Sequence, residues 1–224
     1  MKYDSICETG SIREINQDSI FLDVLEEYGV FCVADGTGDH GNGRLASQAI
    51  VSLVKAGWES MRKDLTDSGF EYVFARLRET IELANIKIFE DLNTNSVCGS
   101  TVVLLLLFEN KYGIISVGDS RLYHCYKDDV RLLAGDEYGK PAKSVGASRS
   151  IILNTIQGEY SRNSSFLLCS DGIYGSMPEN ALQYAIRTWG KHPHKLVSML
   201  KEKVTASGAQ DNFSAVAISV RGIF

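Results

Sequence analysis

The sequence has little proline and no low-complexity segment. It contains three prolines in 224 residues, and no stretch rich in Pro, Gly or Ser marks a linker between domains. No internal repeat is visible. We therefore expect residues 1–224 to form a single domain, whose length is ample for a sizeable core.

Long hydrophobic runs are also missing. The longest, residues 102–108, is far shorter than the roughly 20 residues that span a bilayer, and the N-terminal MKYDSICETG has no apolar signal region. The net charge of −5 argues against nucleic acid or an anionic membrane as the main partner. These features predict a cytoplasmic protein that does not bind membranes.

The cysteines form no disulfide or metal-binding pattern. There are five of them, an odd number, and no C-x-x-C pair occurs. Most lie in apolar runs, where a free cysteine behaves as a small buried hydrophobe. We predict that all five are reduced and structural, which agrees with a cytoplasmic location: Cys7, Cys32, Cys98, Cys125 and Cys169.

The hydrophobic pattern switches between strand-like runs and a period of three to four residues. Strands are expected at 19–25, 29–34, 99–108, 112–117, 122–126, 130–133, 150–156, 165–169 and 213–220, and helices at 42–61, 70–92, 178–189 and 193–206. This order lacks the strict alternation of a doubly wound parallel sheet. It predicts an α+β fold, in which two mostly antiparallel sheets stack face to face with helices outside. The unbroken apolar strand at 102–108 then has both faces covered.

A glycine-rich loop, FCVADGTGDHGNG at 31–43, contains a match to G-x-G-x-x-G at 36–41. A dinucleotide site would need a parallel strand after the following helix and an acid about twenty residues further on. Instead, a second long helix follows, and Glu59 falls within or at the end of the first helix. The alternative is that Asp35, in front of the loop, holds a metal ion.

Five aspartates lie at the ends of predicted apolar strands. Each of them alone is explained by a turn or a helix cap, but four of the five stand beside Gly or Asn. If the strand ends share one edge of the sandwich, the carboxylates crowd together and raise one another's pKa. A hard divalent cation such as Mg²⁺ or Mn²⁺ would relieve this repulsion. The acids are Asp18, Asp35, Asp119, Asp171 and Asp211.

Six short motifs then identify a family. They read GSIREINQDS at 10–19, DGTGDH at 35–40, GST at 99–101, VGDSR at 117–121, SDGI at 170–173 and DNFS at 211–214. In this order the chain resembles the metal-dependent Ser/Thr protein phosphatases of type 2C, particularly the bacterial single-domain ones. The resemblance covers nearly the whole chain and implies a four-layer α-β-β-α sandwich.

The resemblance also implies roles for individual residues. Asp35 would bridge two Mn²⁺ or Mg²⁺ ions, with the Gly36 carbonyl on one of them, and Asp171 and Asp211 as the remaining direct ligands. Asp119, with Asp171, would form a weaker third metal site. Asp18 would act through metal-bound water, Arg13 would hold the substrate phosphate, and Asn212 would support the cluster. A metal-activated water would attack phosphorus without a covalent intermediate. The alternative for Arg13 is a surface salt bridge.

Several positions depart from the family pattern. Thr37 stands where eukaryotic members carry a His proposed as general acid, which makes His40 the candidate proton donor; the alternative is a His that packs or caps at the helix start. Asp39 and Arg44 replace a usual Gly and Glu. The flap segment near 134–148 is shorter than in bacterial relatives, and we expect this to alter substrate choice and third-metal occupancy.

Three functions compete at this point. The leading one is an active phosphatase that removes phosphate from phosphoserine or phosphothreonine in signal transduction, as a monomer opposing a Ser/Thr kinase. The second is a catalytically weak member that binds phosphoproteins as a regulatory module. The third, a nucleotide-binding protein, depends on the glycine-rich loop alone.

Overall fold

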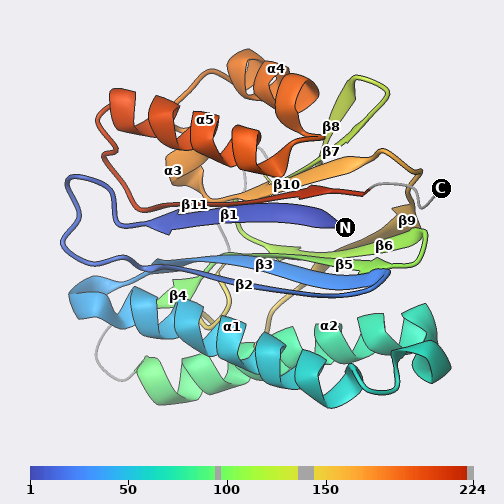
Figure 1. The fold of residues 1–224 in the computed structure, drawn as a ribbon. Helices are drawn as coiled ribbons and strands as arrows, with labels where there is room; N and C mark the ends of the chain where they lie inside the picture. The colour runs from blue at the N-terminus through green and yellow to red at the C-terminus, as the bar shows by residue number, and fades with distance from the viewer. Residues whose placement is uncertain (94–96, 136–143, 221–224) are drawn as a thin grey trace.

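The computed structural model describes residues 1–93, 97–135 and 144–220. Two antiparallel sheets face each other, with α1 and α2 covering the outer face of one and α4 and α5 that of the other (Figure 1). The predicted α+β sandwich is thereby confirmed. The second and third layers are the two sheets, so each sheet has one face toward the other sheet and one face toward helices.

The first sheet has the order β1-β11-β10-β7-β8, and the second β2-β3-β5-β6-β9 with the short β4 paired to β3. The first contains β1 (Lys2–Glu8), β11 (Phe213–Ser219), β10 (Ser165–Cys169), β7 (Arg121–Tyr126) and β8 (Asp129–Ala134). The second contains β2 (Asp18–Leu25), β3 (Tyr28–Thr37), β4 (Gly99–Ser100), β5 (Val102–Phe108), β6 (Lys111–Val117) and β9 (Asn154–Glu159).

The helices follow the predicted apolar stripes. They are α1 (Asn42–Met61), α2 (Leu65–Leu92), α4 (Glu179–Trp189) and α5 (Pro193–Ala206), with a short α3 (Asp171–Tyr174) and a 3₁₀ turn η1 (Asp39–Gly41). α1 and α5 have the predicted bounds. α2 begins five residues before the predicted start, because a short helical segment from Leu65 precedes a kink at Gly69 (φ +72°), and the predicted helix at 70–92 is the part after this kink.

The core between the sheets fixes which residues point inward. In β5 every residue is buried, and Val103, Leu105 and Leu107 pack between the sheets. Their neighbours Val102, Leu104, Leu106 and Phe108 pack toward α1 and α2. The unbroken apolar run is therefore a strand covered on both faces, as predicted.

Two strand predictions were incomplete. β1 was not predicted, and the strand expected at 150–156 lies at Asn154–Glu159 instead. Residues 150–153 stay outside the ladder because Ile151 and Leu153 pack against the helix-side core. Their apolar character therefore reflects contact with that core and not strand pairing.

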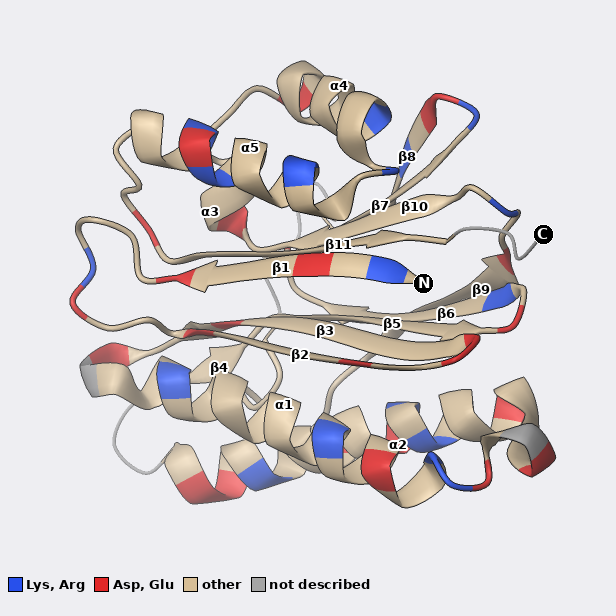
Figure 2. Ribbon diagram, viewed as in Figure 1, with Lys and Arg blue, Asp and Glu red and all other residues tan. Residues whose placement is uncertain are grey.

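The charged residues are interspersed over the outer helices. Acidic segments lie at the end of the sandwich where β2 begins, β3 ends and α3 starts, and others lie in the turns at the opposite end (Figure 2). All five cysteines are free thiols, as predicted. In the described ranges no helix is long and apolar enough to span a bilayer.

Candidate active site

Asp18 and Asp35 form the centre of the acidic end. They are paired in the register of β2 and β3. Residues of the same parity, such as Ile20 in β2 and Val33 in β3, pack in the core between the sheets. Because side chains alternate along a strand, both carboxylates point into the space between the sheets. Asp18 is 5% exposed.

Ser170 connects these acids to the opposite sheet. It follows β10, and its hydroxyl donates to Asp18 Oδ2 at 2.8 Å, while Ser214 N–H donates to Ser170 Oγ at 2.9 Å. The next residue, Asp171, starts α3. One buried hydroxyl thus ties β2 to β10 and β11 and brings Asp171 next to Asp18 and Asp35.

The carboxylates perturb one another strongly. Burial raises the pKa of Asp35 to about 9, with further contributions from the negative charges of Asp18, Asp171 and Asp119. Burial also raises the pKa of Asp18 to about 6. The pKa of Asp171 is raised by burial and by the charges of Asp211 and Asp119. The structure therefore brings together the acids that the sequence placed at strand ends.

The donor set suits a hard divalent cation. Asp18 Oδ1 is buried, and no donor in the described part of the chain reaches it. Carboxylate oxygens are ligands that Mg²⁺ and Mn²⁺ prefer, and a bound cation would offset the mutual repulsion that raises these pKa values. Over the described ranges, however, no three His, Cys, Asp or Glu side chains stand at the spacing of a complete metal site.

Asp211 is held by Arg13. Arg13 Nε donates to Asp211 Oδ1 at 2.9 Å and Nη2 donates to Oδ2 at 3.0 Å. The two side chains are 53% and 40% exposed. This bidentate pair has the geometry in which a guanidinium binds a carboxylate or a phosphate. Arg13 therefore forms a salt bridge, which was the alternative to phosphate binding in the sequence analysis, and its partner, Asp211, is one of the five acids.

Arg13 lies in the loop between β1 and β2, residues 9–17, which we call the Arg13 loop. Asn212, which is 6% exposed, holds this loop in place. Its Oδ1 accepts from Gln17 N–H at 2.9 Å, and its Nδ2 donates to the Thr9 and Ile15 carbonyls at 2.8 and 3.1 Å. Gly10, at φ +80°, lies so close that a Cβ there would be 2.3 Å from the Asp211 carbonyl oxygen. The loop that carries Arg13 is therefore bound to the segment that carries Asp211.

The glycine-rich loop packs against the start of α1. The Gly36 N–H donates to the Gln17 carbonyl at 3.1 Å, and a Cβ at Gly36 would lie 2.0 Å from the Gly43 carbonyl oxygen. This close approach is possible only for glycine. Thr37, Asp39 and Arg44 are exposed.

Asp119 lies in the turn between β6 and β7 and is held by α3. Tyr174 OH donates to the Asp119 carbonyl at 3.2 Å, so the helix that begins at Asp171 also positions Asp119. The Arg121 guanidinium stacks 3.7 Å from the centre of the Tyr174 ring and donates to Glu179 at 2.9 Å. Sequence reasoning missed the contributions of Ser170 and Tyr174, although Ser170 belongs to the quoted SDGI motif.

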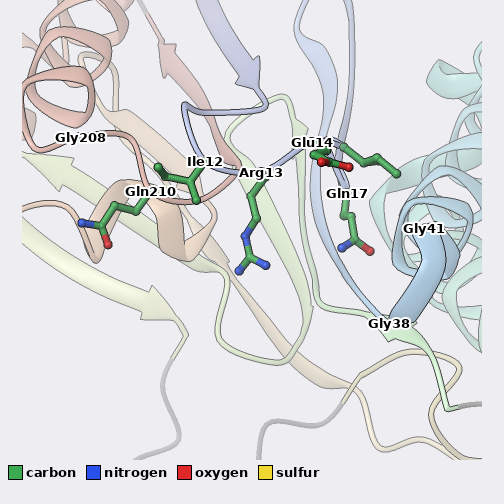
Figure 3. Close-up of a pocket in the computed structure, with 9 residues that line it drawn as sticks. Ile12, Arg13, Glu14, Gln17, Gly38, Gly41, Gly208 and Gln210 are labelled. Carbon is green, nitrogen blue, oxygen red and sulfur yellow. The ribbon is translucent and has the colours of Figure 1, made fainter.

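A cavity of about 900 Å³ lies beside Arg13, which is one of its lining residues (Figure 3). A second cavity, of about 350 Å³, borders Asp171 and Asp211. The first is lined by Ile12, Arg13, Glu14, Ile15, Gln17, Gly38, Gly41, Gly208 and Gln210. The side chain of His40 and most of the flap, residues 136–143, lie outside what the structure describes, so both predictions stand untested.

Comparisons with a family model and with known proteins both find protein phosphatases. A family model described as "Protein phosphatase 2C" matches residues 11–210. "Serine/threonine phosphatase stp" of Listeria innocua is 25% identical over 94% of this chain and 92% of its own length. "Serine/threonine protein phosphatase PstP" of Mycobacterium tuberculosis is 23% identical over 98% of this chain and 45% of its own length.

Solved structures share the fold. PppA, described as a key regulatory component of T6SS in Pseudomonas aeruginosa, superposes with a TM-score of 0.83 at 27% identity, covering 99% of this chain and 97% of that one. The catalytic domain of PstP in complex with two manganese ions superposes with a TM-score of 0.83 at 21% identity, covering 99% and 98%.

Proposed function

The chain belongs to the protein phosphatase 2C family, and we propose that it is a metal-dependent phosphatase that hydrolyses phosphoserine and phosphothreonine in proteins. The observation that carries this proposal is the mutual perturbation of Asp35, Asp18 and Asp171 beside an arginine that lines a cavity. Carboxylates bind the cations and the guanidinium binds the anion, which are the two parts that phosphoryl hydrolysis needs.

The metal ligands we propose are Asp35, the Gly36 carbonyl, Asp171 and Asp211 for two Mn²⁺ or Mg²⁺ ions, with Asp119 and Asp171 at a weaker third site. When bound, such ions lower the pKa of coordinated water and offset negative charge on phosphoryl oxygens. The solved structure of the PstP catalytic domain with two manganese ions supports the binding of two cations. The choice between Mn²⁺ and Mg²⁺ is left open.

Arg13 and Asp18 act on the substrate and on the attacking water. A phosphate presents two oxygens in the same geometry as the Asp211 carboxylate. The Arg13 guanidinium can therefore bind a phosphate in place of Asp211 through the same two parallel hydrogen bonds. Asp18 has Oδ2 fixed by Ser170, which leaves Oδ1 to accept a hydrogen bond from water. The reaction then proceeds by direct attack of water on phosphorus, without a covalent phosphoenzyme.

We make three further proposals, on the proton donor, the flap and the role of the chain. His40, which follows Asp39 in the sequence of the glycine-rich loop, is the proton donor to the leaving group. The short flap near 134–148 changes substrate selectivity and third-metal occupancy. The whole chain acts as one monomeric cytoplasmic domain in signal transduction, opposing a Ser/Thr kinase.

The second candidate is the regulatory module. The Arg13–Asp211 ion pair favours it, because this pair occupies a proposed metal ligand and the proposed phosphate ligand at once. A module of this kind would bind phosphoproteins without turnover.

Hydrolysis of an aryl phosphate across a Mn²⁺ titration separates the two candidates. We expect turnover that rises with Mn²⁺, vanishes with chelator and is lost in Asp35→Asn. The matched control is Asp128→Asn, the same chemical change in an exposed residue of the β7–β8 turn at φ +67°, where asparagine is well tolerated. Absence of turnover at every Mn²⁺ and Mg²⁺ concentration, in folded protein, would refute the phosphatase and leave the regulatory module.

A further inference from the structure

Two isoleucines on the Arg13 loop are unusually exposed for residues that line a cavity. Ile12 is 69% exposed and Ile15 is 42% exposed, and both line the same cavity as Arg13. Single exposed aliphatic residues are common on protein surfaces. Two of them within two positions of a proposed phosphate ligand need a further explanation.

The two side chains lie on different sides of Arg13. In Figure 3 Ile12 stands toward Gln210, while Gln17, Gly38 and Gly41 lie on the other side of Arg13. Ile15 belongs to that other side, because a Cβ built at Gly41 would be 3.7 Å from its Cδ1. The guanidinium is thus flanked by one aliphatic side chain near the C-terminal segment and one near the start of α1.

The loop that carries them is held in place before any ligand binds. The Ser11 N–H donates to the Ala209 carbonyl at 2.7 Å, and Asn212 Nδ2 donates to the Ile15 carbonyl at 3.1 Å. These bonds anchor the loop next to Ile12 and at Ile15. Exposed aliphatic groups on a preorganised backbone lose little conformational entropy on binding.

We propose that Ile12 and Ile15 form an apolar rim, which binds aliphatic side chains on both sides of the phosphorylated residue of a protein substrate. The inference rests on the proposed function, because it takes Arg13 as the phosphate ligand. The charge of Arg13 selects the phosphate, and the two isoleucines select what flanks it. A cavity of about 900 Å³ can take a short peptide segment as well as its phosphate.

The occupant is an extended segment of a phosphoprotein. A chain in this conformation advances about 3.3 Å per residue, with alternate side chains on one face. When the phosphoserine meets Arg13, the residues two positions before and after it are the nearest that share its face. We therefore expect a preference for Leu, Ile, Val or Met at these two positions.

The test measures binding, so it does not require turnover. Fluorescent peptides carry a non-hydrolysable difluoromethylene phosphonate of phosphoserine, with either Leu or Ser two positions on each side, and their Kd is measured by anisotropy in the presence of Mn²⁺. We expect the Leu peptide to bind about tenfold more tightly, the change that partial burial of an aliphatic side chain produces. The double variant Ile12→Ser, Ile15→Ser should bind both peptides equally.

The control is Ile152→Ser, since Ile152 is 76% exposed but does not line this cavity; it should keep the tenfold preference. Equal Kd values for the two peptides with the unmodified protein, or a preference that survives in the double variant, would overturn the rim. A third result would also overturn it. If light scattering shows a dimer of the unmodified protein that is lost in the double variant, and the unmodified protein binds the two peptides with equal Kd, the isoleucines join two copies of the chain.

The two failures are distinguishable. A protein that prefers the Leu peptide but hydrolyses no phosphate ester refutes the proposed catalytic function and keeps the rim. A protein that hydrolyses aryl phosphate with Mn²⁺ but binds the two peptides equally keeps the function and refutes the rim.

Discussion

The substitution Asp35→Asn should stabilise the metal-free protein, although it removes a residue at the centre of the proposed site. The pKa of Asp35 is raised from 3.8 to about 9, first by burial and then by neighbouring carboxylates. At pH 7.5 the folded protein retains a proton that the unfolded chain has lost. Since the folded state binds more protons in this range, raising the pH above 3.8 lowers its stability.

The size of the effect follows from the pH interval. Each pH unit between 3.8 and 7.5 costs at most about 1.4 kcal/mol, which sets an upper bound of about 5 kcal/mol. Asp35 keeps some contact with solvent, which screens part of this cost. We expect Asp35→Asn to gain about 2–3 kcal/mol in the free energy of unfolding, or roughly 5–10 °C in Tm for a chain of this size.

The same variant should lose the response to metal. At Mn²⁺ concentrations about 100 times Kd, the unmodified protein gains roughly 3 kcal/mol, whereas Asp35→Asn should gain much less. The lead of the variant in chelator, about 2–3 kcal/mol, should therefore largely disappear in Mn²⁺. Urea unfolding followed by circular dichroism at pH 7.5 in both conditions measures this, with Asp128→Asn as the matched control.

Two results would refute the reasoning. If Asp35→Asn were less stable than the unmodified protein in chelator, the carboxylate would be stabilising the fold, and the crowding deduced from the structure would be wrong. If both proteins gained equally from Mn²⁺, the cation would bind elsewhere.

Three further predictions follow from the same contacts. In chelator, the Tm of the unmodified protein should fall as the pH rises from 6 to 9, because the raised pKa of Asp35 makes deprotonation costly; a flat calorimetric profile would contradict this. Arg13→Ala should lower kcat/KM for an aryl phosphate about 100-fold but change the free energy of unfolding by less than about 1 kcal/mol, because its ion pair is half exposed; a loss of stability well above this would assign Arg13 a structural role. Tyr174→Phe should remove the hydrogen bond to the Asp119 carbonyl, cost about 1 kcal/mol and weaken Mn²⁺ binding in a calorimetric titration, whereas Tyr184→Phe, at an exposed tyrosine of α4, should do neither.

The sequence predicted the elements whose burial is strong and periodic. α1 shows the period clearly because its buried face, which includes Ile50, Val54 and Trp58, recurs at three and four residues. β1 escaped prediction because it is an edge strand, and only Ile6 among its residues is buried. An edge strand needs little apolar surface, so its pattern is weak in the sequence.

The site, like the fold, could be predicted only in part. The acids could be placed because each lies next to an apolar strand, and the ends of antiparallel strands meet at shared edges. The partners that fix them could not, since Ser170 lies 152 residues from Asp18 and Arg13 lies 198 residues from Asp211. The first pairing depends on how the two sheets stack, and the second depends on the pairing of β1 with β11; no local pattern records either. Roles as metal ligands, general acid and flap remain predictions.

The acidic cluster exists because the core holds it there. Asp18 faces Asp35 in the β2–β3 register, and in the same register Phe21 faces Cys32 and Leu22 faces Phe31. When both carboxylates are charged, their repulsion is of order 4 kcal/mol at close range near a protein surface, and a slip of one residue would relieve it. The slip would also turn every inward side chain of β2 to the other face of the sheet. Ile20, Leu22 and Val24 would then leave the core between the sheets. Asp23, which accepts a hydrogen bond from Trp58 Nε1 at 2.7 Å on the helix side, would turn into that core without this partner, which is costly for a carboxylate. These two losses outweigh the repulsion between the acids, so the packing of the sandwich decides the register and holds Asp18 beside Asp35.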